Sequence, residues 1–494
     1  MAVATGSARY RFGEGVRAGV LLGMGLRQAA PLVAGVLWLT VWLMAQLPFV
    51  GVLGPIVGAV VAFGRWKRAP LYEIAAPGLR LVAGRTTGRR QWTKSPLLAA
   101  GPGLEDRVPA PLAGLDLADV EIEWPPGRCR VGLIADRRAG TLSLVVPVSA
   151  GGFPVASAVE QDGLVAAWGA ALSPLARARC SIARVTWQEW CRPIGVGGHR
   201  EYLAEVRRGA AHPAAIDDYG QLLAEHAPFT ASHDVHVTLT LDMRRIHGRR
   251  GRDAAVDVLV EEARQLCSRL DAGSFTTAAP LSAGEIAFAV RQRSDPTRMT
   301  QLEGLRRSLA SAAGYGNLEW GPMAVEPDWF STRVDESVHR SYRIAGWPML
   351  PVAADWLAPL LTVDGVVRTV SIVMEPVPLA SAAADANRQL TSIEADLQQK
   401  ERHGFRLTAR EKRRHDDVET RERELAEGHP LFHHAGFVTV TAASEAALDE
   451  ACGVVEQSAA QSLLDLRPLA ARQVEGWVAS LPLGRSVRPG GGWR

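Results

Sequence analysis

The sequence predicts an α+β protein, with an N-terminal transmembrane helical hairpin followed by two ferredoxin-like α+β units, the second carrying an inserted helical hairpin. Three observations support this fold class. Residues 28–64 contain no charged residue and no histidine. Strand-like and helix-like patterns alternate from residue 127 onward. A proline-free, charge-rich segment interrupts the last of these patterns at 381–427. The predicted parts are a basic arm with the hairpin (1–70), a connector (71–126), a first unit (127–275) and a second unit (276–494).

The charge-free stretch 28–64 is too long for one membrane helix. A single helix would run roughly 55 Å, whereas a bilayer core of about 30 Å needs only about 20 apolar residues. A proline near the middle of the stretch, Pro48, is expected to end or kink a helix. We therefore predict two short transmembrane helices joined by a turn at Gln46, Leu47, Pro48 and Phe49.

Basic residues flank this stretch on both sides. Arg17 and Arg27 precede it, and Arg65, Lys67 and Arg68 follow it. Cytoplasmic flanks of membrane helices are rich in Lys and Arg, so a hairpin with both termini in the cytoplasm accounts for both clusters. The apolar length argues against a cleaved signal peptide; a buried core hairpin is the remaining alternative. We predict a multi-pass protein of the inner (cytoplasmic) membrane, in contact with the lipid bilayer.

The overall composition is that of an ordinary globular protein. The chain has 494 residues, a formal net charge of +3, 47% hydrophobic and 22% charged residues, which indicates two or three domains. The near-balanced charge gives no electrostatic case for nucleic acid, so no direct nucleic-acid binding is expected. The cysteines are odd in number and form no CxxC pair, which predicts free thiols in a reducing compartment. They are Cys129, Cys180, Cys191, Cys267 and Cys452.

Regular structure begins after the connector, which is rich in Pro and Gly and is expected to hold loops with short strands. In the first unit, 130–148 predicts two strands with a turn at 137–140, 157–172 a helix and 180–190 a strand. The sequence HVTLTL at 236–241 alternates apolar and polar residues and is the clearest strand of the chain. We expect Asp253 to cap the helix that follows.

The second unit repeats this arrangement. A strand is predicted at 340–346, a helix at 351–361, a strand at 366–374 and another at 436–442, after which Ser444 begins a helix. Helices packed on a mostly antiparallel sheet indicate α+β sandwiches, and the ferredoxin-like arrangement is the simplest.

The charged segment 381–427 predicts two helices in a protruding hairpin. Opposite charges at four-residue spacing, such as Glu419 and Arg423, support each helix. This hairpin is either a solvated surface or a contact with a partner subunit.

Catalytic and nucleotide-binding motifs are missing from the sequence. The only Lys-Ser pair, at Lys94, has no glycine-rich loop before it, and no GxGxxG follows a strand. The serine-hydrolase GxSxG and the zinc-binding HExxH are absent as well. We therefore predict that the chain is not an enzyme, with no catalytic residue and no cofactor.

Two groups of histidines are candidate metal ligands. His233 and His236 are three apart in a strand, which places them on opposite faces. His429, His433 and His434 lie closer together, but no cysteine or carboxylate stands at ligand spacing. No metal site is predicted.

A family resemblance is carried by the C-terminal stretch. Gly428-His429 precedes the strand GFVTVTA at 436–442, an amphipathic helix follows, and LPLGR closes it at 481–485; near the N-terminus stands YRFGEGVRAG at 10–19. With these features the chain resembles the actinobacterial integral membrane proteins of conjugation-like and type IV secretion-like gene clusters. The hairpin looks like PrgI-type inner-membrane subunits, and the body looks like the N-terminal, non-motor domain of TraC/TrbE-type ATPases.

The resemblance implies a docking or scaffolding role and carries over no catalytic residue. In the ATPases a P-loop motor follows the LPLG region, whereas here SVRPGGGWR follows it. We expect a non-enzymatic scaffold that docks a separate P-loop ATPase at the cytoplasmic face and forms homo- or hetero-oligomers. The alternatives are a membrane component of a type VII secretion system and a membrane-anchored enzyme, such as a transferase.

Overall fold

The computed structural model describes most of the chain, and all structural statements below concern these residues. They are residues 8–10, 12, 25–66, 69–87, 91–94, 109–149, 151–193, 213–226, 231–246, 251–299, 302, 321–402, 409–427 and 429–487. The α+β fold class is confirmed. Within the described residues, the main strands join one 13-stranded sheet in which every pair is antiparallel.

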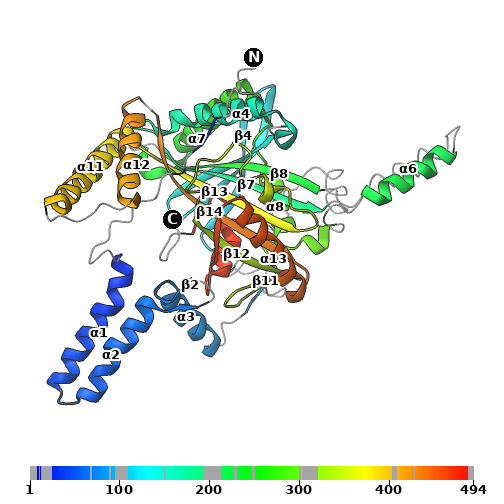
Figure 1. The fold of residues 1–494 in the computed structure, drawn as a ribbon. Coiled ribbons are helices and arrows are strands. Elements are labelled where there is room, and N and C mark those ends of the chain that lie inside the picture. Colours follow the sequence, from blue (N-terminus) through cyan, green and yellow to red (C-terminus); the bar gives the residue numbers. More distant parts are fainter. Residues whose placement is uncertain are drawn as a thin grey trace.

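The N-terminal hairpin consists of α1 (Leu26–Met44) and α2 (Pro48–Phe63), which project away from the body (Figure 1). At 1.5 Å per residue, α2 with its 16 residues is about 24 Å long, shorter than a bilayer core of about 30 Å. The first turn of α1 contains Arg27 and Gln28, which shortens its apolar part.

Neither these two helices nor any other described helix combines the length and the apolar character that a membrane span needs. The predictions of a transmembrane hairpin and of a multi-pass inner-membrane protein with both termini in the cytoplasm are therefore wrong. The chain leaves helical geometry between Met44 and Pro48, so the apolar length of 28–64 is divided between two short helices.

Four short elements connect the hairpin to the body: β1 (Arg65–Trp66), β2 (Ala69–Pro70), α3 (Leu71–Thr86) and β3 (Trp92–Thr93). The predicted connector 71–126 thus contains a 16-residue helix, α3, besides its short strand. It also contains the whole of a ten-residue strand, β4 (Leu115–Trp124).

The first half of the body follows in chain order. Its elements are β5 (Gly127–Asp136), β6 (Thr141–Ser149), α4 (Ala158–Leu172), β7 (Ile182–Pro193), α6 (Pro213–His226), β8 (Ala231–Asp242), α7 (Arg252–Ala272), β9 (Thr276–Thr277) and α8 (Ala283–Ser294). Side by side, the strands run β9, β6, β8, β7. Helix α4 begins in a capping box between Ser157 and Glu160. Asp253 is not the expected cap of α7, because it lies inside the first turn and Gly251 holds the cap position.

The second half has a matching order. Its elements are β10 (Ala324–Pro327), β11 (Thr332–Val334), β12 (Ser337–Gly346), α10 (Ala358–Leu361), β13 (Val367–Val377), α11 (Leu379–Arg402), α12 (Ala409–Ala426), β14 (Leu431–Ala442), α13 (Glu445–Gln461), β15 (Asp465–Pro468) and α14 (Gln473–Ala479). Side by side, four of the strands run β15, β12, β14, β13. Ser444 caps α13 as predicted, accepting a hydrogen bond from Ala447 N. The helix predicted at 351–361 is much shorter, because only 358–361 is helical.

The two halves join through the pairing of β7 with β13, which extends from Arg368 opposite Cys191 to Met374 opposite Val185. Helices α4 and α7 pack on one half, and α10 and α13 on the other, on the same face of the sheet. Trp187 at the junction contacts both hydrophobic cores.

The opposite face is covered by α8, α14 and the C-terminal segment. Arg184 Nη1 donates a hydrogen bond to Gly484 O (2.6 Å), and Gln188 Nε2 donates to Leu481 O (3.0 Å). These side chains extend from the central strand β7, so the LPLGR segment at 481–485 packs beneath the junction of the two halves.

A short N-terminal segment also packs on the body. Tyr10 and Val352 exchange two backbone hydrogen bonds (2.8 and 3.0 Å), and the Tyr10 hydroxyl donates to Asp162 Oδ1 (3.0 Å). The ring of Phe12 stacks on Trp347 with centroids 5.4 Å apart and meets Trp356 edge-on at 4.8 Å. The segment therefore contacts both halves, since Asp162 belongs to α4 and the other partners follow β12.

Candidate functional site

The four predicted turn residues lie at the tip of the α1–α2 hairpin. Gln46, with φ at 58°, and Leu47 connect the two helices. Pro48 and Phe49 are the first residues of α2, where a proline costs no hydrogen bond because the first helical N–H has no partner within the helix. The side chain of Phe49 is 92% exposed.

The predicted basic flanks are only partly described. Arg27 lies in the first turn of α1, and Arg65 lies in β1, which pairs with β2. Arg17, Lys67 and Arg68 lie outside the described residues. Of these five side chains the structure describes only that of Arg65, so their role as membrane-flanking residues stays a prediction.

Small residues hold α1 and α2 together. A Cβ atom at Gly35 would lie 2.6 Å from Gly54 O, and one at Gly58 would lie 2.5 Å from Pro31 O. The helices thus approach to backbone contact, a distance that only glycine permits. The Trp38 indole also donates a hydrogen bond to Val50 O (3.1 Å). Glycines and Trp38 therefore form the internal contacts of the hairpin, and most of its other large side chains are exposed.

Those large side chains form an exposed apolar surface, here called the hairpin surface. It consists of Val33, Val36, Leu37, Trp38, Val41, Leu43, Met44, Leu47, Phe49, Val52, Leu53, Ile56, Val57, Val60 and Phe63, each between 47% and 92% exposed. Contiguous apolar surface of this extent is rare on monomers and marks an interaction site. No charged side chain interrupts it, because 28–64 contains none.

The root of the hairpin is anchored to the body. Trp66 contacts the rings of Trp329 and Phe330 edge-on, with centroids 5.1 and 5.0 Å apart. Arg343 Nη2 lies 3.3 Å from Glu73 Oε2 in α3. A cavity of about 380 Å³ beside this root is lined by both apolar residues and arginines. These contacts orient the hairpin surface relative to the sheet.

The charged segment forms the second projecting hairpin, α11–α12 (Figure 1). Its root packs through Ala382, Ala386 and Leu425, and the expected Glu419–Arg423 pair is present at 3.4 Å. His415, Asp416 and Glu419 lie close enough together to share a cation, but all three stand on an outer surface of α12, where acidic groups commonly gather without a metal.

The histidines follow the strand geometry expected from their spacing. His233 and His236 point to opposite faces of β8 and do not converge. His236 Nδ1 accepts a hydrogen bond from Arg293 Nη2 (2.6 Å), and burial together with the Arg293 charge lowers the pKa of His236 to about 3. His434 packs edge-on against Trp347. Burial lowers the pKa of His434, as expected for a ring held in an apolar contact.

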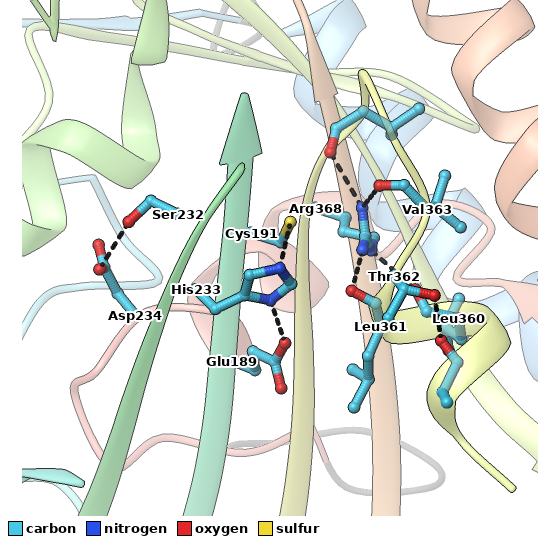
Figure 2. Close-up of polar contacts among 12 residues, drawn as sticks. Glu189, Cys191, Ser232, His233, Asp234, Leu360, Leu361, Thr362, Val363 and Arg368 are labelled. Atoms are coloured by element: carbon cyan, nitrogen blue, oxygen red, sulfur yellow. Dashed lines mark hydrogen bonds and ion pairs between the residues drawn. The ribbon is translucent and has the colours of Figure 1, made fainter. Parts of the chain in front are cut away.

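A constellation that the sequence analysis missed lies on β7 and β8, where His233 stands between Glu189 and Cys191 (Figure 2). The sequence alone predicts Cys191 to be a free thiol and His233 to lie on the opposite strand face from His236. The signal available in the sequence was the spacing Glu-Trp-Cys at 189–191, which places an acid and a thiol on one strand face. The histidine joins them only through strand pairing.

Comparison with known proteins assigns no family to the chain, so the function is argued from the structure. No protein-family model matches the chain, and no curated protein matches it.

Proposed function

We propose that the chain is a docking scaffold whose α1–α2 hairpin binds a partner protein, and that the partner is a separate P-loop ATPase of a type IV secretion-like or conjugation-like system. The kind of partner comes from the resemblance of the body to the non-motor domain of secretion ATPases. The exposed apolar side chains of α1 and α2 support the choice of this hairpin as the docking site.

The observation that carries the proposal is the hairpin surface. Val36, Val41 and Val57 are 55%, 61% and 58% exposed on an element held to the body only at its root. Removing apolar surface from water contributes about 25 cal/mol per Å², so these side chains favour association with an apolar face of another molecule. The glycine contacts already stabilise the hairpin internally, which leaves the large side chains for a partner.

The architecture of the body supports a scaffolding role. We infer that each half is a ferredoxin-like unit, since β9-β6-β8-β7 and β15-β12-β14-β13 both follow the spatial order 4-1-3-2 of that motif. The α11–α12 hairpin is then an insertion between the second and third strands of the second unit. Two such units joined edge to edge form a rigid platform that orients both projecting hairpins.

The test measures binding between the purified full chain and the P-loop ATPase encoded nearest to it in the genome. We expect Val41→Asp to weaken the complex at least about tenfold, because a buried carboxylate would have to lose its hydration. Val159→Asp is the matched control, since Val159 is 72% exposed on α4, away from the hairpin. It should bind like the unmodified chain.

Four results would contradict the proposal. The ATPase could bind both variants equally, or not bind at all. Self-association lost in Val41→Asp would assign the hairpin surface to a second copy of the chain. Flotation with phosphatidylglycerol vesicles that is lost in Val41→Asp, without ATPase binding, would assign the surface to lipid.

A further inference from the structure

The cluster on β7 and β8 has the linear order carboxylate, imidazole, thiol. Cys191 and His233 are directly paired across the two strands, and Glu189 precedes Cys191 by two residues on the same face of β7. His233 Nδ1 donates a hydrogen bond to Glu189 Oε1 (2.6 Å), while Nε2 lies 3.8 Å from Cys191 Sγ (Figure 2). One ring nitrogen is thus held by an acid and the other faces sulfur.

This geometry suits proton transfer better than metal binding. A chelate needs its donor atoms to converge on one point, whereas here the carboxylate and the sulfur stand at opposite nitrogens of the same ring. A nucleophile beside a base that is oriented by a carboxylate is the arrangement used for covalent catalysis.

Two cationic side chains lie beside the sulfur of Cys191. Hydrogen bonding to Cys191 and to Glu189 raises the pKa of His233 to about 10, against the opposing effect of burial, so the ring carries a positive charge at neutral pH. On the other side, Arg368 is the partner of Cys191 in the β13 register. Its guanidinium is fixed by hydrogen bonds to Leu360 O (2.8 Å) and Val363 O (2.6 Å). Cations beside a thiol stabilise its thiolate.

Accessibility alone would single out a different cysteine. Cys191 is only 2% exposed, although the neighbouring His233 side chain is 39% exposed and gives solvent a route to the cluster. Cys129 is the cysteine of intermediate exposure, and the other three are buried. Burial raises the pKa of Cys129, Cys180, Cys267 and Cys452, which keeps these four as thiols.

We propose that Cys191 is a nucleophile that accepts acyl groups from thioesters or aryl esters, with His233 as its acid–base partner and Glu189 as the residue that positions the ring. The thiolate attacks the acyl carbon, the new C–S bond forms and the bond to the leaving group breaks. The leaving thiol or alcohol takes its proton from the His233 imidazolium. Neutral His233 then accepts a proton from the water that hydrolyses the thioester, which restores the starting state.

This activity goes beyond docking and stands independently of it. The prediction that the chain is not an enzyme rests on the absence of nucleotide-binding, GxSxG and HExxH motifs. Such motifs are continuous in sequence, so their absence does not exclude a site formed by residues of two paired strands. The variants at the hairpin surface therefore serve as further controls, since they should leave the thiol chemistry unchanged.

The first experiment needs no variant. The native full chain is treated with iodoacetamide at pH 6, and the labelling rate of each cysteine is followed by peptide mass mapping. We expect Cys191 to react at least about tenfold faster than Cys129, because only a thiolate alkylates at this pH. Labelling in the order of exposure, with Cys129 first, would overturn the proposal.

The second experiment uses p-nitrophenyl acetate at pH 7 as the acyl donor. We expect a burst of about one p-nitrophenolate per chain and a single acetyl group on Cys191. Cys191→Ser should abolish both, and Cys129→Ser should retain both. His233→Gln should slow acetylation by about 100-fold. Acetylation that persists in Cys191→Ser contradicts the assignment.

The role of Glu189 is tested by the pH dependence of the iodoacetamide reaction at Cys191. A purely structural role of Glu189 would leave this pH dependence unchanged. In Glu189→Gln the imidazolium loses its anionic partner, so the pH at which iodoacetamide reaction with Cys191 reaches half its maximum should rise by about one unit. Glu189→Asp should restore part of the shift. An unchanged profile in Glu189→Gln would remove Glu189 from the site.

Discussion

Arg485 and Asp136 form a buried ion pair that fastens the C-terminal segment to the turn between β5 and β6. Arg485 Nε lies 2.8 Å from Asp136 Oδ2, and the two side chains are 1% and 5% exposed. The guanidinium also donates a hydrogen bond to Ala113 O (2.9 Å). The other oxygen of Asp136 accepts hydrogen bonds from the backbone N–H of Arg138 and Ala139. The pair thus joins residues that are far apart in sequence.

Removing one partner of this pair should destabilise the fold strongly. We expect Arg485→Met to lower the free energy of unfolding by about 3–5 kcal/mol, because Asp136 would remain buried without its counter-charge. Urea unfolding measures the change. The control is Arg467→Met, whose partner Asp465 lies at 2.9 Å on a partly exposed surface, with an expected loss below about 1 kcal/mol. Equal losses in the two variants would contradict this account.

Stability should fall in acid because of His339. This ring is fully buried in β12, and Nε2 donates to Ser294 O while Nδ1 accepts from the Thr441 hydroxyl (both 2.9 Å). Burial lowers its pKa from 6.5 to about 4, against the raising effect of Ser294 O. A lowered folded-state pKa means that the stabilisation is complete above pH 6.5 and is lost as pH falls from 6.5 towards 4.

The size of this acid effect can be isolated by substitution. A shift of this size corresponds to about 3 kcal/mol as an upper figure. His339→Gln should remove that part of the pH dependence while lowering stability at pH 7, because one hydrogen bond is lost. His429→Gln is the control, since the His429 side chain is 67% exposed. Urea unfolding at pH 7, 6, 5 and 4 gives the profiles, and parallel profiles for the two variants would refute the role of His339.

Two glycine-to-alanine substitutions should have opposite effects. In Gly58→Ala the new Cβ would lie 2.5 Å from Pro31 O, so α1 and α2 must separate. Gly163 in α4 is exposed with open space around it, and Gly163→Ala should stabilise the chain by about 1 kcal/mol through helix propensity alone. Hydrogen exchange localises the effects. We expect faster exchange throughout 26–63 in Gly58→Ala and slower exchange in α4 in Gly163→Ala; unchanged exchange in the hairpin would contradict the tight packing.

The fold class could be predicted because local sequence patterns for strands and helix caps match the elements of the structure. The alternation in HVTLTL becomes the buried part of β8, and Ser444 caps α13 as its position indicated. Such signals depend on neighbours in sequence, so they survive tertiary packing. The apolar stretch 28–64 misled for the opposite reason. The hydrophobicity of a segment indicates only that its side chains favour an environment without water. Whether that environment is a bilayer or the apolar surface of another protein depends on the helix length and on partners outside the segment.

The candidate thiol site could be predicted only in part. The spacing of Glu189 and Cys191 places them on one strand face, but His233 lies 42 residues beyond Cys191 along the chain. Their contact depends on the register between β7 and β8, where a slip of one residue would turn His233 to the other face. The sequence between the two strands contains no marker of that register. A search for continuous sequence motifs therefore does not find the Glu189–His233–Cys191 cluster, which becomes visible only when β7 and β8 are paired.

The packing of the N-terminal segment has a consequence for the order of events during synthesis. Tyr10 and Phe12 leave the ribosome well before their partners at Asp162, Val352 and Trp347 are made. At about 5–20 residues per second, the contact with Trp347 waits on the order of tens of seconds. Throughout that interval Tyr10 and Phe12 have emerged without these contacts. Factors that act on nascent chains therefore meet this region before the finished protein can shelter it.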